Sequence, residues 1–176
     1  MIGVAHAPIA EGPLSAMFVG HQMPEGQESL VILPLPVRKH FEDLQGMLHQ
    51  YCVTDLPHLT ACSEALRELR VIYRNVQYFY DKPHGVQSGQ IMRYTTMISS
   101  EFVRLMQARY PPALVILAHY CAAAQTVKQA WYSANWPTYA LQGITMALDG
   151  SMQHWLAWPR EQIHNGLAAV TRSDGS

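Results

Sequence analysis

The chain has 176 residues, of which 49% are hydrophobic and only 14% are charged, and its formal net charge is −1. This length suits one domain that buries about two thirds of its unfolded surface. The near-neutral charge and the lack of any cluster of Lys and Arg argue against independent binding of nucleic acid. So low a share of charged residues leaves an apolar surface, and we expect a homodimer.

Residues 1–36 are rich in Gly and Pro, which predicts an irregular N-terminal arm. The arm does not have the pattern of a secretory signal, because no Lys or Arg precedes its apolar part and Pro8, Glu11 and Pro13 interrupt it. We therefore expect an intracellular protein, either cytoplasmic or nuclear.

Two helices are predicted to follow the arm. Over residues 37–51 the apolar side chains recur at intervals of three and four, which is the helical period. Asp55 and Pro57 then give a start signal for a long amphipathic helix that reaches about residue 80. The segment DKPHGVQSGQ, residues 81–90, is predicted to be a loop from its Pro and Gly.

Ser99 or Ser100 can cap the next helix, which must end near Arg109 because two prolines follow. These prolines begin PPALVILAHYCAAA, residues 111–124, the most apolar segment of the chain. It is shorter than the roughly 20 apolar residues that a membrane span requires. Because it is apolar nearly all round, we expect it at the centre of a helical bundle, surrounded by other helices.

The segment WYSANWP breaks the helical pattern, and Asn135 and Pro137 start another helix. Its apolar stripe runs as far as WLAWP through Leu141, Ile144, Leu148, Met152 and Trp155. A last short helix is predicted from Pro159, and the polar end at 171–176 is predicted to be disordered. No segment alternates like a strand, so the fold class is all-α: one bundle of six to seven helices over residues 37–170.

The spacing of cysteines and histidines indicates neither a metal site nor a cofactor. Cys52, Cys62 and Cys121 form no CxxC pair and are expected to be reduced, buried thiols. The nine histidines form no HxH, HxxxH or HExxH pattern. The chain also has no GxSxG and no glycine-rich phosphate loop.

An ordered set of residues carries a family resemblance: RYPPALVILAHY at 109–120, then Trp131–Tyr132, Trp136, and Trp155 with Trp158–Pro159. Residues 98–163, which contain this set, resemble the C-terminal part of the regulatory domain of fungal zinc-cluster transcription factors, above all the sterol-uptake control regulators. The resemblance implies an all-helical, often dimeric domain whose C-terminal helices enclose an apolar pocket for a sterol. The turn SANWP departs from the glycine-rich turn of that family, and the six-cysteine DNA-binding cluster is missing.

Six residues are candidates for a site. His119 interrupts the apolar helix and could act as an acid, a base or a hydrogen-bond donor, or it could be a buried histidine with one partner. Tyr120 lies on another face of that helix, because adjacent residues are about 100° apart. Flat aromatic side chains that suit either a ligand pocket or core packing are Trp131, Trp136, Tyr139 and Trp155.

We therefore expect a non-enzymatic domain that binds a hydrophobic small molecule, similar to a sterol or terpenoid, at His119 and the four aromatic residues. The alternative is a stand-alone enzyme of fungal secondary metabolism, a cofactor-free cyclase or pericyclase such as a Diels–Alderase. It would orient an apolar precursor while His119 or Tyr120 stabilises developing charge. A third hypothesis is a dimerisation module that accompanies a full-length regulator.

Overall fold

The computed structural model describes residues 31–127 and 135–165. Within these ranges the chain forms α-helices and one 3-10 helix but no strand, which confirms the all-α prediction. The helices are α2 (Leu35–Tyr51), α3 (Leu56–Phe79), α4 (Ser88–Met97), α5 (Ser100–Gln107), α6 (Pro111–Ala124), α7 (Trp136–Ala147), η1 (Gln153–Leu156) and α8 (Ala157–Asn165). Most of the predicted arm, the segment with Trp131 and the predicted tail lie outside the described residues.

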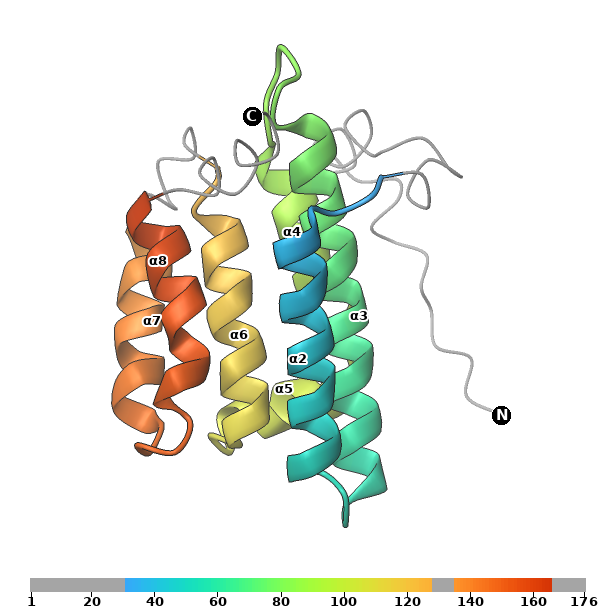
Figure 1. Cartoon of the computed structure of the whole chain (residues 1–176), viewed down its shortest axis with the longest axis vertical. Coiled ribbons are helices and arrows are strands. Elements are labelled where there is room, and N and C mark those ends of the chain that lie inside the picture. Colours follow the sequence, from blue (N-terminus) through green and yellow to red (C-terminus); the bar gives the residue numbers. More distant parts are fainter. Residues whose placement is uncertain (1–30, 128–134, 166–176) are drawn as a thin grey trace.

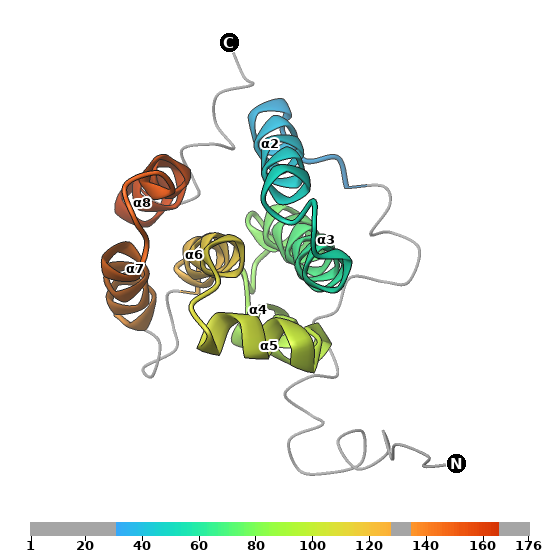
Figure 2. The same ribbon diagram turned by 90° about the horizontal axis from the view of Figure 1, so that it is seen from below.

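Helix α6 lies at the centre of the bundle (Figure 1). It contacts α2 and α3 on one side, α7 and α8 on another, and α4 and α5 on a third, as the view from below shows (Figure 2). Helix α5 lies across one end of the bundle, whereas the other α-helices run roughly along its long axis (Figures 1 and 2). The central position predicted for the apolar helix is therefore confirmed.

The composition of α6 explains why it can be surrounded. Every side chain in it is buried except those of Pro111 and Leu117. Its second half is rich in alanine, and such short side chains allow neighbouring helices to approach closely. The helix begins with two prolines, which suit a first turn because its backbone N–H groups have no partner within the helix.

The start of α3 also agrees with the sequence. Asp55 is its N-cap, and the Asp55 carboxylate accepts a hydrogen bond from the backbone N–H of His58 at 3.2 Å. Pro57 lies in the first turn, where proline is tolerated. The helix ends at Phe79, at the point that the apolar period predicts.

Two helix starts differ from the predictions. Helix α2 begins at Leu35, because Pro34 serves as its N-cap and Pro36 lies in its first turn, so these prolines start the helix that they were expected to delay. Helix α4 was not predicted at all, and it begins at Ser88, within the predicted loop 81–90. A capping box stabilises this start, in which the backbone N–H of Gln87 donates to Oε1 of Gln90 at 2.9 Å.

The helix predicted to run from Pro137 to WLAWP is broken, and this prediction was wrong. Helix α7 ends at Ala147, and Oδ1 of Asp149 accepts hydrogen bonds from the backbone N–H (3.1 Å) and the hydroxyl (2.6 Å) of Ser151. Such local bonding offers the backbone an alternative to the helix. After η1, helix α8 starts at Ala157, so Pro159 lies inside its first turn instead of at its start.

The three cysteines are buried and form no disulfide, as predicted. The Cys52 Sγ atom lies 3.2 Å from the Tyr110 hydroxyl, where α5 and α6 meet the end of α2. Burial, with a smaller contribution from the neighbouring Cys52, raises the pKa of the Cys62 thiol to about 12. Among the described residues no helix has both the length and the apolarity needed to cross a membrane.

The sequence allowed Ser99 or Ser100 to cap α5, and the structure selects Ser99, whose Oγ accepts from the backbone N–H of Phe102 at 3.2 Å. We predict that Ser99→Ala lowers the free energy of unfolding by about 1 kcal/mol, because this N–H group loses its partner. Ser100→Ala should change it by only a few tenths, or roughly 0.3 kcal/mol. Urea denaturation of both variants tests the prediction, and equal losses would contradict it.

Candidate functional site

His119 lies in the middle of α6 with none of its surface exposed. The Nδ1 atom of His119 is 2.7 Å from the carbonyl oxygen of Val115, one helical turn earlier. Because a carbonyl oxygen only accepts, Nδ1 must carry the proton and donate it. In the neutral ring this leaves Nε2 as an acceptor.

His40 of α2 supplies the donor for that nitrogen. The two Nε2 atoms of His40 and His119 are 2.6 Å apart. Since Nε2 of the neutral His119 ring can only accept, His40 must donate its Nε2–H. The two rings therefore share a single proton between these nitrogens, and both tautomers follow from the geometry.

Both histidines are held in the neutral form. Burial, together with the nearby His40, lowers the pKa of His119 to about 3, although the hydrogen bond to Val115 opposes this effect. Burial also lowers the pKa of His40, although Asp43 on the same helix opposes this effect. A second proton on the pair would place two N–H groups face to face in an apolar environment.

Aromatic rings and a hydroxyl complete this histidine cluster. The Trp158 ring of α8 stacks on His40 with centroids 4.7 Å apart, and on His119 at 5.5 Å. The Tyr73 hydroxyl of α3 donates to the backbone carbonyl of His119 at 2.9 Å. The cluster thus joins α2, α3, α6 and α8, and both ring nitrogens of His119 have a hydrogen-bond partner.

Tyr120 points to a different neighbour, as its position in the helix predicts. The Tyr120 hydroxyl donates to the carbonyl of Ile91 at 3.2 Å, and its ring stacks on Tyr94 with centroids 4.6 Å apart. Trp136 lies beside it, with a centroid distance of 6.0 Å. The structure therefore brings Tyr120 and Trp136 together but places His119 in a separate cluster.

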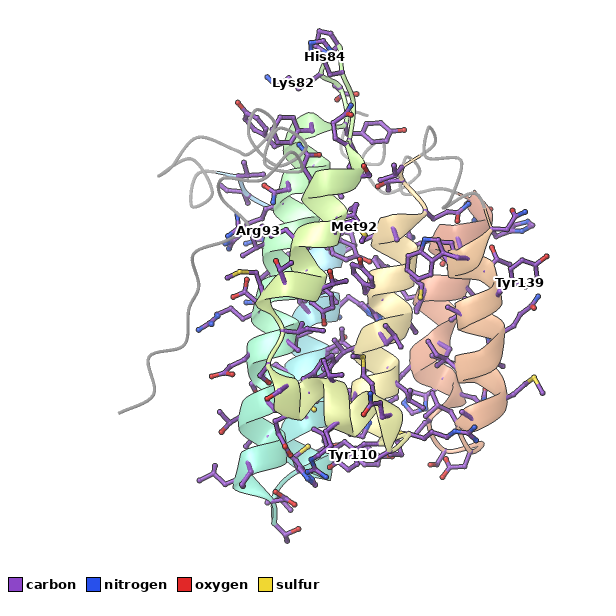
Figure 3. All side chains as sticks on the ribbon, turned by 180° about the vertical axis from the view of Figure 1, so that it is seen from behind. Lys82, His84, Met92, Arg93, Tyr110 and Tyr139 are labelled. Carbon is purple, nitrogen blue, oxygen red and sulfur yellow. The ribbon has the colours of Figure 1, made fainter. Side chains whose placement is uncertain are left out.

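Trp155 and Tyr139 do not join either group. Trp155 is half-buried against His154, with centroids 4.9 Å apart. Tyr139 is 67% exposed and points away from the bundle (Figure 3). Trp131 lies outside the described residues.

Sequence reasoning did not connect His119 with the two rings that stack on it, those of His40 and Trp158. Trp158 was visible only as a neighbour of Trp155, three residues away. His40 is 79 residues from His119, and no local pattern connects the two.

A groove opens between α5, α6 and α7, with a volume of about 590 Å³. We call it the α5–α7 groove, and it is lined by Met106, Gln107, Arg109, Leu114, Leu117, Ala140, Gly143, Ile144, Met146 and Ala147. Most of these side chains are apolar, and the volume lies within the range of roughly 300–1,000 Å³ that is common for ligand sites. None of the five sequence candidates that the structure describes lines this groove.

Arg109 lines the groove in a backbone conformation that usually requires glycine, with φ of 56°. Its N–H donates to the carbonyl of Met106 at 3.0 Å, and the N–H of Tyr110 donates to that of Leu105 at 2.9 Å. These two bonds form a Schellman motif, which turns the chain from α5 into α6. The strained arginine therefore lies where a ligand in the groove would meet a cation.

The part of the chain that the structure describes contains no group of three or more His, Cys, Asp or Glu side chains that could hold a metal ion. Comparisons with protein-family models, with curated proteins and with solved structures find no match for this chain.

The His119 ring should make folding sensitive to acid. A histidine whose pKa falls from about 6.5 when unfolded to about 3 when folded contributes stability that is complete above pH 6.5. As the pH drops below 6.5, the unfolding free energy should decrease by up to about 1.4 kcal/mol per pH unit. We predict that His119→Gln, which removes the titrating group, flattens this dependence between pH 6.5 and 4. Urea denaturation across this range measures both proteins, and parallel curves would contradict the prediction.

The Arg109 backbone gives a second test. Arg109→Gly should raise the unfolding free energy by about 1 kcal/mol, because glycine adopts positive φ without strain. Ala108→Gly is the matched control and should give no gain, since Ala108 has φ of −75°. If Arg109→Gly is destabilising in urea denaturation, the arginine side chain contributes more to the fold than its backbone strain costs.

Proposed function

We propose that this protein binds a hydrophobic small molecule, and that the α5–α7 groove receives it. The observation that carries the proposal is the apolar lining of a 590 Å³ groove beside a strained arginine. An apolar ligand gains free energy in proportion to the apolar area that it removes from water. Met106 and Met146 add flexible side chains that can adapt to its shape.

The lining favours a rigid apolar body with one polar group, as in a sterol or terpenoid. Leu114, Leu117 and Ile144 suit the body, whereas Gln107 and Arg109 can hydrogen-bond a hydroxyl or carboxyl group. Helices α6 and α7 also lie within residues 98–163, which resemble the regulatory domain of fungal zinc-cluster transcription factors. That resemblance supports the same class of ligand.

The cyclase alternative has less support at this groove. Its two candidate residues, His119 and Tyr120, do not line the groove, and their polar atoms are bonded within the core. Catalysis in the groove would depend on Gln107 and Arg109 as donors.

A homodimer remains part of the proposal, because Met146 at the groove is 88% exposed and a second copy could cover it.

A substitution in α7 tests binding without damaging the fold. A Cβ atom added to Gly143 would meet no atom within 4 Å, so Gly143→Leu places its side chain in the open groove. We predict that this variant binds the fluorescent sterol dehydroergosterol at least about tenfold more weakly than wild type, because the leucine takes up ligand space. Gly46→Leu is the matched control, since Gly46 in α2 also has open space around it but lies outside the groove.

Both leucine variants should be as stable as wild type or more so, because leucine favours a helix more than glycine does. Equal binding by wild type and Gly143→Leu would reject the groove as the site. Extraction after incubation then distinguishes the functions: unchanged sterol supports binding, and a rearranged product from a linear terpenoid probe would support the cyclase. Mass measurement in solution decides whether the protein is a dimer, and binding lost only in the dimer would mean that a second copy covers the groove.

A further inference from the structure

A second pocket lies between α2 and α3, with a volume of about 290 Å³. We call it the arginine pocket, and it is lined by Val31, Ile32, Leu33, Arg38, Glu42, Arg70 and Arg74. It shares no lining residue with the α5–α7 groove. Helices α2 and α3 lie on the other side of α6 from α7 (Figure 2), so the two sites are independent.

The lining carries an excess of positive charge. Three arginines face one carboxylate, that of Glu42, which gives a local charge of 3 − 1 = +2. Within the described ranges none of these three arginines forms an ion pair, whereas Arg67 pairs with Glu68. Since no described residue neutralises this positive charge, the pocket attracts an anion.

Two of the arginines have features that favour an anion. The Arg70 guanidinium lies over the Phe41 ring, 5.3 Å from its centroid, and this contact orients its donors. The Nε atom of Arg74 is buried and makes no hydrogen bond with the described residues. A buried donor without an acceptor is costly. An anion that accepts a hydrogen bond from the Arg74 Nε–H would remove this cost, which favours its binding.

We propose that the arginine pocket binds a phosphate monoester that carries an apolar group. Arginine donors match the oxygens of phosphate in pairs, and a monoester near neutral pH carries about −1.5 to −2 charges, which balances the local charge of +2. A carboxylate carries only one charge. Val31 and Leu33 provide an apolar wall for the group attached to the phosphate.

Titration calorimetry on the full chain tests this with phenyl phosphate, inorganic phosphate and benzoate as probes. We expect phenyl phosphate to bind more tightly than either of the others, because only it has both the charge and the apolar group. Arg38→Gln should weaken this binding about tenfold, since one charge-assisted contact is lost. Arg38 is exposed, so the variant is expected to fold, and its circular dichroism spectrum checks this.

Arg67→Gln is the matched control, because it removes the same charge from α3 outside the pocket. Equal weakening by Arg38→Gln and Arg67→Gln would overturn the proposal and indicate general charge attraction. No binding of phenyl phosphate by the folded chain, or benzoate binding as tightly, would also overturn it. Phosphatidylcholine vesicles with added phosphatidic acid distinguish the source: binding that Arg38→Gln weakens assigns a lipid headgroup, and binding of phenyl phosphate alone assigns a soluble ester.

Discussion

The burial of a histidine in the central helix is the constraint on which the arrangement of the bundle depends. Helix α6 is apolar nearly all round and can be stable only when other helices cover it. His119 adds two ring nitrogens that must find partners without water. Val115 satisfies one, His40 satisfies the other, and Trp158 covers the rings. Helices α2 and α8 thereby dock on α6 in one register.

Because buried polar groups need partners, the polar residues that stabilise the core are different from those that line the two pockets. The histidine cluster and the Tyr120–Tyr94 stack fill the core, and their hydrogen bonds engage the groups that would otherwise be the most reactive. Open space remains at the margins of the bundle: the α5–α7 groove beside the turn at Arg109, and the arginine pocket between α2 and α3. A ligand at either place would leave the core contacts intact.

Only part of the candidate site could be predicted from the sequence. His119 attracted attention because a polar ring in an apolar helix is costly, and the structure confirms that it is buried. Its partner could not be predicted, because His40 is 79 residues away on a helix whose docking has no signature in the chain. The groove was missed for a similar reason: Leu114 and Gly143 are ordinary helix residues until α6 and α7 lie side by side. A cavity is a property of two surfaces.

By itself, the sequence determined the all-α class, the central place of the apolar helix, the cap at Asp55 and the reduced cysteines. These depend on periodicity, composition and nearest neighbours, which short stretches of chain contain. The tertiary structure alone decided the tautomers of the histidine pair and the positions of both pockets. The break after Ala147 has a local cause, the bonds between Asp149 and Ser151, which the apolar period does not reveal. The apolar spacing of the sequence continues past the end of α7. The side chains of Leu148, Met152 and Leu156 that maintain it are buried, although the helix has ended. Burial of an apolar side chain in the core is favourable whether its backbone is helical or not.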